Sequence, residues 1–183
     1  MVSLDGYFEG PGHDLSWHNV DGEFNKFAIA QLHTIGTLIF GRMTYEMMAS
    51  YWPTEAALAD DPAVAGLMNE LPKVAVSKTL KEASWKNSTL IRDNLKDQIT
   101  ALKEQPGKDL ALFGSASLLA TLLENEQVDE CRLMINPVVL AGGRPLFAVS
   151  KGKLKLNLVR TQVFGNGNVL LCYQPEASSA MSD

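Results

Sequence analysis

The chain has 183 residues, of which 46% are hydrophobic, a size and composition that fit one domain with a substantial core. Its 16 Lys and Arg against 21 Asp and Glu give a net charge of −5. This balance argues against nucleic acid as a general partner, because a phosphate backbone needs a basic surface. No stretch has the length and apolarity of a bilayer span, and the start lacks the features of a signal peptide. We therefore expect a cytoplasmic protein with neither a membrane nor a nucleic-acid partner.

The cysteines and histidines argue against a disulfide-stabilised protein and against a metal-binding protein. Cys131 and Cys172 are far apart and lie in apolar, strand-like runs, which predicts buried thiols rather than a disulfide framework. His13, His18 and His33 lack the spacing of metal ligands, so no metal site is expected.

Strand and helix patterns alternate through the first part of the chain. The apolar spacing of residues 21–34 predicts a helix, and Pro53 is expected to end a second helix. In chain order we expect a strand end at 1–6, a loop at 7–15, a helix at 21–34, a strand at 37–41, a helix at 42–50, a loop at 54–61 and a short helix ending near Leu71.

The next expected elements are strands at 73–77, 88–92 and 109–113 and helices at 94–105 and from 115. The last third then changes to strands alone, at 130–136, 154–163 and 168–173. The alternation predicts a parallel sheet with helices on both faces, and Asn166-Gly167 predicts a closing antiparallel hairpin. The polar residues 175–183 are expected to be a disordered tail.

Three strand ends carry residues suited to phosphate. Gly41, Arg42 and Thr44 follow the strand at 37–41, where a glycine permits close approach and a helix begins. Ser77 and Lys78 with Thr79 follow the strand at 73–77. The third set, Gly114, Ser115 and Ala116 with Ser117, opens the helix after the strand at 109–113.

Each turn also has an ordinary interpretation. The first is then a strand-to-helix turn with a surface arginine, the second a solvated loop and the third a serine cap. All three together would fit one long dinucleotide along the sheet edge, because ligands of open α/β sheets bind at the carboxyl ends of the strands. Neither a Gly-x-Gly-x-x-Gly fingerprint nor a Walker lysine loop is present, so this is not a standard Rossmann or P-loop site.

The order of several short motifs resembles the dihydrofolate reductase-like family that includes the reductase domain of the bacterial riboflavin-biosynthesis bifunctional protein (the RibD C-terminal domain type). The motifs are Ser3-Leu4-Asp5-Gly6, Gly41-Arg42-Met43-Thr44-Tyr45, Leu71-Pro72-Lys73-Val74-Ala75-Val76-Ser77, Phe113-Gly114-Ser115-Ala116, and the run from Asn136 to Phe147. The resemblance implies a single domain over residues 1–174 with a three-layer α/β/α fold, a mostly parallel mixed sheet and a C-terminal hairpin. Family members have a full strand before the first motif, where this chain has Met1 and Val2, so that strand looks truncated.

The resemblance also assigns residues to a cofactor, NADPH. Gly41, Arg42 and Thr44 match the turn that holds the cofactor phosphates, Ser77 and Lys78 the loop facing the 2′-phosphate, and Gly114, Ser115 and Ala116 the turn under the pyrophosphate. Trp17 matches a tryptophan near the nicotinamide and substrate. Asp21 approximates a substrate-binding carboxylate, and Asp5 lies in the turn at the substrate mouth.

Side-chain chemistry leaves alternatives open at the substrate side. Asp21 is the first candidate to hold or polarise the substrate and Asp5 the second, but a helix cap and a turn former explain them equally well. Tyr45 and Trp52, with Tyr51, could wall a flat ring, although core packing would also account for them.

We therefore expect an NADPH-dependent oxidoreductase that transfers a hydride to a small pterin-like or pyrimidine-like substrate. The alternatives are a riboflavin-pathway 5-amino-6-(5-phosphoribosylamino)uracil reductase in the strict sense, or a non-catalytic nucleotide-binding protein on the same fold. The first alternative ranks lower because the chain lacks the zinc deaminase motif that usually accompanies that role. The resemblance also allows a homodimer through the late strands.

Overall fold

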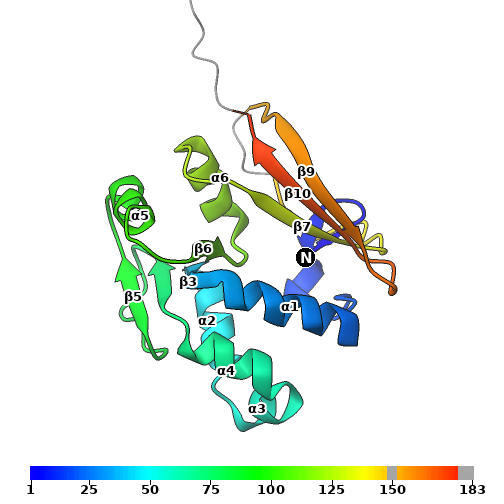
Figure 1. Cartoon of the computed structure of the whole chain (residues 1–183), viewed down its shortest axis with the longest axis horizontal. Helices are drawn as coiled ribbons and strands as arrows, with labels where there is room; N and C mark the ends of the chain where they lie inside the picture. The colour runs from blue at the N-terminus through cyan, green and yellow to red at the C-terminus, as the bar shows by residue number, and fades with distance from the viewer. Residues whose placement is uncertain (148–151, 177–183) are drawn as a thin grey trace, which may run out of the picture. The chain divides into compact units, whose positions relative to one another are not determined.

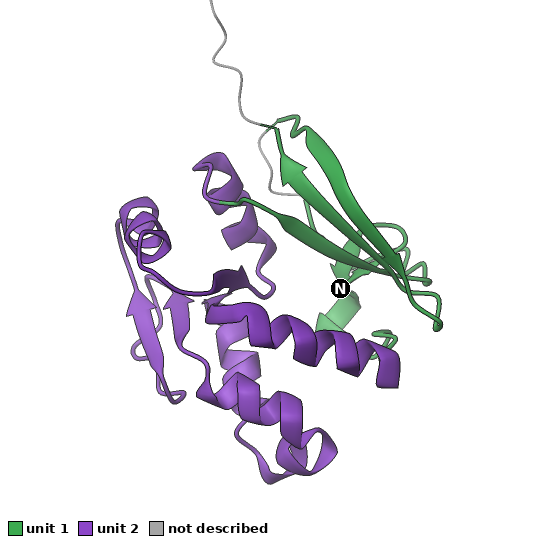
Figure 2. Cartoon of the chain, viewed as in Figure 1, with its two compact units in different colours: residues 1–21, 128–183 green, residues 22–127 purple. Residues whose placement is uncertain are grey.

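The structure, a computed structural model, describes residues 1–147 and 152–176. The backbone divides into two compact units (Figure 2). Unit 1 comprises residues 1–21 and 128–183, and unit 2 comprises residues 22–127. The single domain expected over 1–174 stays a prediction, and residues 177–183 of the expected tail lie outside the described residues.

Unit 2 contains a four-stranded sheet in the order β5-β4-β3-β6, in which every neighbouring pair is parallel (Figure 1). Its strands are β3 (Ile35–Gly41), β4 (Lys73–Val76), β5 (Ser88–Ile91) and β6 (Asp109–Leu112). All four confirm predicted strands, and the parallel pairing confirms the sheet expected from strand–helix alternation. Leu38, Ile39 and Phe40 are at most 3% exposed, as expected for a central strand covered on both faces.

Unit 2 also contains six helices. They are α1 (Gly22–Thr34), α2 (Arg42–Tyr51), α3 (Glu55–Asp60), α4 (Pro62–Glu70), α5 (Leu95–Lys103) and α6 (Ala116–Glu124). The prediction of a loop over 54–61 is wrong, because α3 lies there. Two caps account for it: the Thr54 hydroxyl accepts from the Ala57 N–H at 3.2 Å, and Asp61 Oδ1 accepts from the Val64 N–H at 3.0 Å to start α4.

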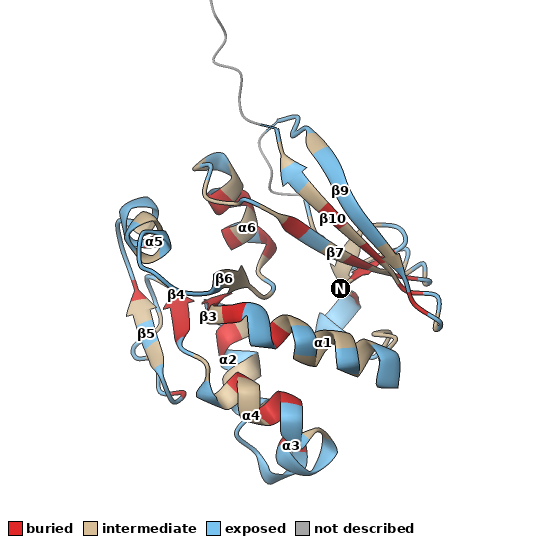
Figure 3. Ribbon diagram, in the orientation of Figure 1, coloured by how far each residue is buried: buried red, intermediate tan, exposed pale blue. Residues whose placement is uncertain are grey.

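The core of unit 2 forms around aromatic rings of β3, α2 and the segment before β5 (Figure 3). The Phe40 and Trp85 ring centroids are 6.0 Å apart, and the Tyr45 and Trp85 centroids are 6.1 Å apart. The Tyr45 hydroxyl accepts a hydrogen bond from the Trp85 backbone N–H at 2.9 Å. This bond fixes α2 against the chain that enters β5.

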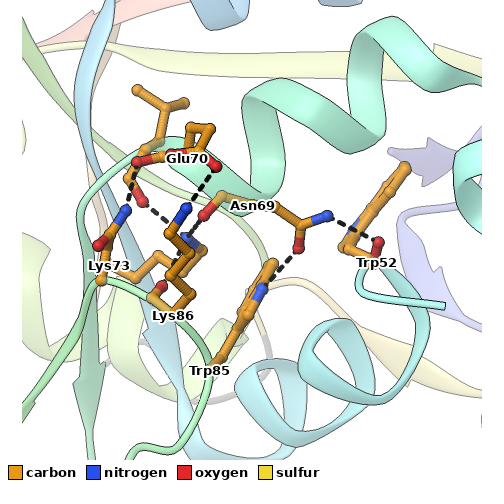
Figure 4. Close-up of polar contacts among 8 residues, drawn as sticks. Trp52, Asn69, Glu70, Lys73, Trp85 and Lys86 are labelled. Atoms are coloured by element: carbon orange, nitrogen blue, oxygen red, sulfur yellow. Dashed lines mark hydrogen bonds and ion pairs between the residues drawn. The ribbon is translucent and has the colours of Figure 1, made fainter.

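Lys73, the first residue of β4, is only 1% exposed. Its ammonium donates to three carbonyl oxygens, those of Asn69 at 2.8 Å, Leu71 at 2.7 Å and Lys86 at 3.0 Å, and lies 4.4 Å from the Trp85 ring centroid. Figure 4 shows these contacts joining the end of α4 to the segment before β5. Burial lowers the pKa of Lys73 to about 8, although nearby Glu70 opposes the shift.

Unit 1 contains a mixed sheet in the order β1-β7-β10-β9 and a separate two-stranded ribbon, β2-β8. The strands are β1 (Val2–Ser3), β2 (Tyr7–Glu9), β7 (Cys131–Asn136), β8 (Arg144–Pro145), β9 (Leu156–Val163) and β10 (Val169–Pro175), and a short 3-10 helix spans Pro11–His13. β1 pairs parallel with β7, and β9 and β10 form the predicted antiparallel hairpin. Cys131 and Cys172 are buried free thiols, as predicted. The loop expected at 7–15 holds β2 and the 3-10 helix, so that prediction is corrected.

None of the helices in the described ranges combines the length and the apolar character that a bilayer crossing requires.

Candidate functional site

The three phosphate-suited turns of unit 2 lie at one edge of its sheet. Gly41 ends β3, Ser77 follows β4 and Phe113-Gly114 follows β6. Because β4, β3 and β6 are adjacent and parallel, their carboxyl ends meet at the same edge. The topology therefore allows one ligand at the carboxyl edge to reach all three turns.

Two of these turns contact each other closely. A Cβ added to Gly41 would overlap the Ser115 side chain, 2.7 Å from its Cβ. Gly114 has a φ of +75°, and a Cβ on it would lie 3.1 Å from Thr44 Cγ2. A side chain at either glycine would therefore clash with the neighbouring turn. The turns after β3 and β6 thus pack against each other through small residues. A surface of small residues lets backbone N–H groups come near a pyrophosphate.

The helices that begin at these two turns differ in capping. Gly41 precedes α2 and provides no side-chain cap, so the first N–H groups of α2 receive no hydrogen bond from it. Ser115 precedes α6 with φ 70° and ψ 86°, an uncommon conformation for a residue with a side chain, and its hydroxyl accepts from the Leu118 N–H at 3.4 Å. Unusual backbone geometry of this kind often accompanies binding sites.

The charged side chains at this edge are exposed. Arg42 is paired with Glu46 across one helical turn, with 3.4 Å between Nη1 and Oε2, and both side chains are nearly half exposed. An exposed pair of this kind is weak, so the guanidinium can exchange its partner for a phosphate. Lys78 is exposed, whereas the Ser77 hydroxyl accepts from the Thr79 and Leu80 N–H groups at 3.1 and 2.9 Å and thus also shapes the turn.

Asp5 of unit 1 organises a loop. Its carboxylate accepts hydrogen bonds from Ser3 Oγ at 2.6 Å and from the backbone N–H groups of Leu140 at 3.2 Å and Ala141 at 2.8 Å. The Ser3 bond and these N–H groups lower the pKa of Asp5. A carboxyl with a lowered pKa is a poor proton donor at neutral pH, which favours the turn-forming role over a catalytic one.

Trp17 and Asp21 lie on the same segment of unit 1. The Trp17 indole N–H donates to the Asp14 carbonyl at 3.0 Å, and its ring meets His18 edge-on, with 4.5 Å between centroids. Asp21 is half-buried and directly precedes α1, the position of a helix cap. Burial lowers the pKa of His18 to about 4 and Asp14 partly opposes it, so the imidazole is neutral at physiological pH.

Tyr45 of α2 and Trp52, which directly follows α2, lie elsewhere. Tyr45 is 2% exposed inside the core, and the Trp52 carbonyl accepts from Asn69 Nδ2 at 2.9 Å. Asn69 Oδ1 in turn accepts from the Trp85 indole at 2.8 Å, beside a hollow of about 330 Å³ that Ala49, Pro53, Ser84 and Lys86 also line. Lys73, at the start of β4, belongs to this network, so it lies at the amino edge of the sheet, opposite the three turns. We therefore leave Tyr45 and Trp52 out of the proposed site.

The fold and the turns together define a protein of the dihydrofolate reductase-like class. Over 96% of this chain and 93% of the other, it superposes on dihydrofolate reductase from Enterococcus faecalis complexed with NADP(H), with a TM-score of 0.63 and 15% identity. A candidate riboflavin biosynthesis protein from Shewanella sp. PV-4 gives a TM-score of 0.73 with 24% identity over 96% of both chains.

Within that class, the chain belongs to the RibD C-terminal domain family, whose model matches residues 1–170. It is also 34% identical over 174 residues to YyaP of Bacillus subtilis strain 168, an uncharacterized protein, covering 94% of this chain and 90% of that relative. The expected homodimer stays a prediction.

Proposed function

We propose that this chain is a reductase that uses NADPH to reduce a small pterin-like or pyrimidine-like ring. The observation that carries the proposal is the meeting of three phosphate-suited turns at the carboxyl edge of three adjacent parallel strands. The membership of the RibD C-terminal domain family and the likeness to an NADP(H)-bound dihydrofolate reductase support the choice of cofactor.

In this proposal each turn binds one part of the cofactor. Backbone N–H groups at the starts of α2 and α6 and the Arg42 guanidinium hold the pyrophosphate, and Lys78 with Ser77 holds the 2′-phosphate. The close approach of Gly41 to Ser115 and of Gly114 to Thr44 brings the turns after β3 and β6 together, which suits one ligand that contacts both turns. When bound, NADPH supplies the hydride, and the protein orients the rings and excludes water.

On the substrate side we propose Trp17 as a ring contact and Asp21 as the group that holds or polarises the substrate. Asp5 is the weaker candidate, because its lowered pKa and its bonds to Leu140 and Ala141 suit a structural carboxylate. A structural neighbour from Thermotoga maritima is named as a 5-amino-6-(5-phosphoribosylamino)uracil reductase, which supports that compound as a second candidate substrate beside dihydrofolate.

NADPH binding tests the proposal first, through quenching of tryptophan fluorescence or a change in NADPH fluorescence. We expect Arg42→Ala and Lys78→Ala each to raise the NADPH Kd about tenfold to a hundredfold, because each removes a charge-assisted bond to phosphate of about 1.5–3 kcal/mol. The matched control is Lys108→Ala, since Lys108 is exposed at the start of β6, at the other edge of the sheet. Equal Kd values for all three variants and the wild type would contradict the cofactor placement.

Turnover then separates the candidate reactions. Loss of NADPH absorbance with dihydrofolate indicates a pterin-type reductase, and loss with 5-amino-6-(5-phosphoribosylamino)uracil indicates the riboflavin-pathway reaction. NADPH binding without turnover of either compound would favour the non-catalytic nucleotide-binding alternative.

A further inference from the structure

Four asparagines from separate parts of unit 1 meet at one place, which we call the asparagine clasp: Asn19, Asn136, Asn166 and Asn168. The Asn19 backbone N–H donates to Asn136 Oδ1 at 2.8 Å. The Asn19 carbonyl accepts from Asn168 Nδ2 at 2.7 Å and from Asn166 Nδ2 at 3.3 Å, and its side-chain Nδ2 donates to the Asn166 carbonyl at 2.8 Å. Asn19 is thus held through both its backbone groups and its side chain.

The clasp is buried at some cost. Asn136, the last residue of β7, and Asn168, just before β10, are both 0% exposed. Asn168 Oδ1 has no hydrogen-bond partner within the described part of the chain, and an unpaired buried amide oxygen destabilises a fold. Apolar side chains would avoid that cost. Buried amides instead specify one arrangement of the segments they join.

The segment that the clasp fixes is the one that carries Trp17 and His18. Its other hydrogen bonds are local: Ser16 N–H to Asp14 Oδ1 at 2.9 Å, the Trp17 indole to Asp14 at 3.0 Å and His18 N–H to Leu15 at 3.1 Å. Local bonds give the segment its shape, whereas the bonds of Asn19 connect it to the end of β7 and to the β9–β10 hairpin.

We propose that Asn136, Asn166 and Asn168 are positioning residues, which hold the Trp17–His18 segment in the conformation that the substrate meets. The inference rests on the proposed reductase function. The three asparagines do not act on the substrate; they act through Asn19 on its neighbours Trp17 and His18. The turns assigned to NADPH belong to unit 2, so we expect loss of the clasp to affect turnover and to leave cofactor affinity nearly unchanged.

The main variant is Asn168→Ala, which removes the 2.7 Å bond to the Asn19 carbonyl. Asn19→Ala is the milder second variant: Asn19 is half-buried, and the change removes only the side-chain bond to Asn166, so folding is retained. The matched control is Asn125→Ala, since Asn125 is half-buried in unit 2 and donates to the Thr121 carbonyl at 2.7 Å.

The first measurement is independent of activity. Full-length protein labelled with 5-fluorotryptophan gives one fluorine resonance for each of the 3 tryptophans, and Trp17→Phe assigns that of Trp17. We expect the clasp variants to shift or broaden the Trp17 resonance and to raise deuterium uptake in residues 10–20, while the Trp52 and Trp85 resonances and the control stay as in the wild type. An unchanged Trp17 resonance with unchanged uptake overturns the proposal.

The second measurement is NADPH oxidation with whichever of dihydrofolate and 5-amino-6-(5-phosphoribosylamino)uracil the wild type turns over. We expect kcat to fall about tenfold or more with an NADPH Kd within about twofold of the wild type, because small misplacements of a substrate-contacting group cost orders of magnitude in rate. A loosened segment with unchanged kcat overturns the positioning role. If the wild type turns over neither compound, the proposed function has failed, and the fluorine and deuterium data alone decide whether the clasp holds the segment.

Discussion

The buried ammonium of Lys73 donates to three main-chain carbonyls, which is an unusual arrangement for the first residue of a strand. We expect Lys73→Met to destabilise the protein by about 2–4 kcal/mol, because it leaves buried carbonyls without donors even though it removes a buried charge. The measurement is urea unfolding at neutral pH. A methionine variant as stable as the wild type would show that burial of the charge costs as much as the three bonds contribute.

The matched control for Lys73→Met is Lys86→Met. Lys86 is exposed and pairs with Glu70 at 2.6 Å, a surface ion pair. We expect a change in unfolding free energy of less than about 1 kcal/mol for this variant.

Asp5 holds the loop around Leu140 and Ala141 through both carboxylate oxygens. We expect deuterium uptake in residues 137–143 to increase from wild type to Asp5→Asn to Asp5→Ala, because the amide keeps one acceptor oxygen and alanine keeps none. The lowered pKa of Asp5 means that this anchor is fully present above the ordinary aspartate pKa of 3.8 and is lost only as the pH falls below it. Equal uptake in the three proteins would show that other contacts hold the loop.

At the scale of elements, the start of α6 depends on the absence of a side chain at the end of β3. Gly41→Ala would place a Cβ against the Ser115 side chain, so either the turn before α6 or the end of β3 has to move. We expect a loss of about 1–3 kcal/mol in unfolding free energy, the usual cost of overpacking, together with weaker NADPH binding.

Gly66→Ala is the control for this glycine. Gly66 lies within α4, and a Cβ there would meet nothing within 4 Å. We expect a gain of about 0.5–1 kcal/mol, because alanine favours helix over glycine. A Gly41→Ala variant that gained stability in the same way would show that the two turns have room to separate.

Most elements of the chain could be predicted from the sequence because their signals are local. An apolar run closed by Gly41 marks β3, and Pro53 marks the end of α2. The alternation of strands and helices in turn predicts the parallel pairing of β4, β3 and β6. The helix α3 was missed because its cap, Thr54, stands in a polar stretch that is also typical of loops.

The candidate site was harder to predict because its details depend on contacts between distant residues. Nothing near Tyr45 indicates that its hydroxyl bonds to Trp85, 40 residues further on, so the sequence left both core packing and ring contact open for it. Lys73 opens a predicted strand and Asn166 precedes Gly167 in a predicted hairpin turn, and neither local pattern indicates a distant partner. In each case one partner is a main-chain group from a distant part of the chain: the Trp85 N–H for Tyr45, the Lys86 carbonyl for Lys73 and the Asn19 carbonyl for Asn166.

At the scale of the whole molecule, we expect His18 to contribute an acid dependence to stability. The imidazole Nε2 is buried and has no hydrogen-bond partner within the described ranges, and burial lowers the His18 pKa from 6.5 to about 4. Between these values the unfolded chain binds a proton that the native protein does not. The contribution of His18 to the free energy of unfolding is therefore fully present above pH 6.5 and decreases as the pH falls towards 4, by at most about 1.4 kcal/mol per pH unit.

Urea unfolding across that pH window checks this expectation. His18→Phe keeps a ring of similar size but cannot bind the proton, so we expect its unfolding free energy to depend less on pH than that of the wild type. His33→Gln is the control, because it removes an exposed histidine of α1 in place of the buried one. If His18→Phe and the wild type lose stability in parallel, the acid sensitivity arises from other groups, and the His18 ring has enough access to water in the native protein to accept a proton at its ordinary pKa.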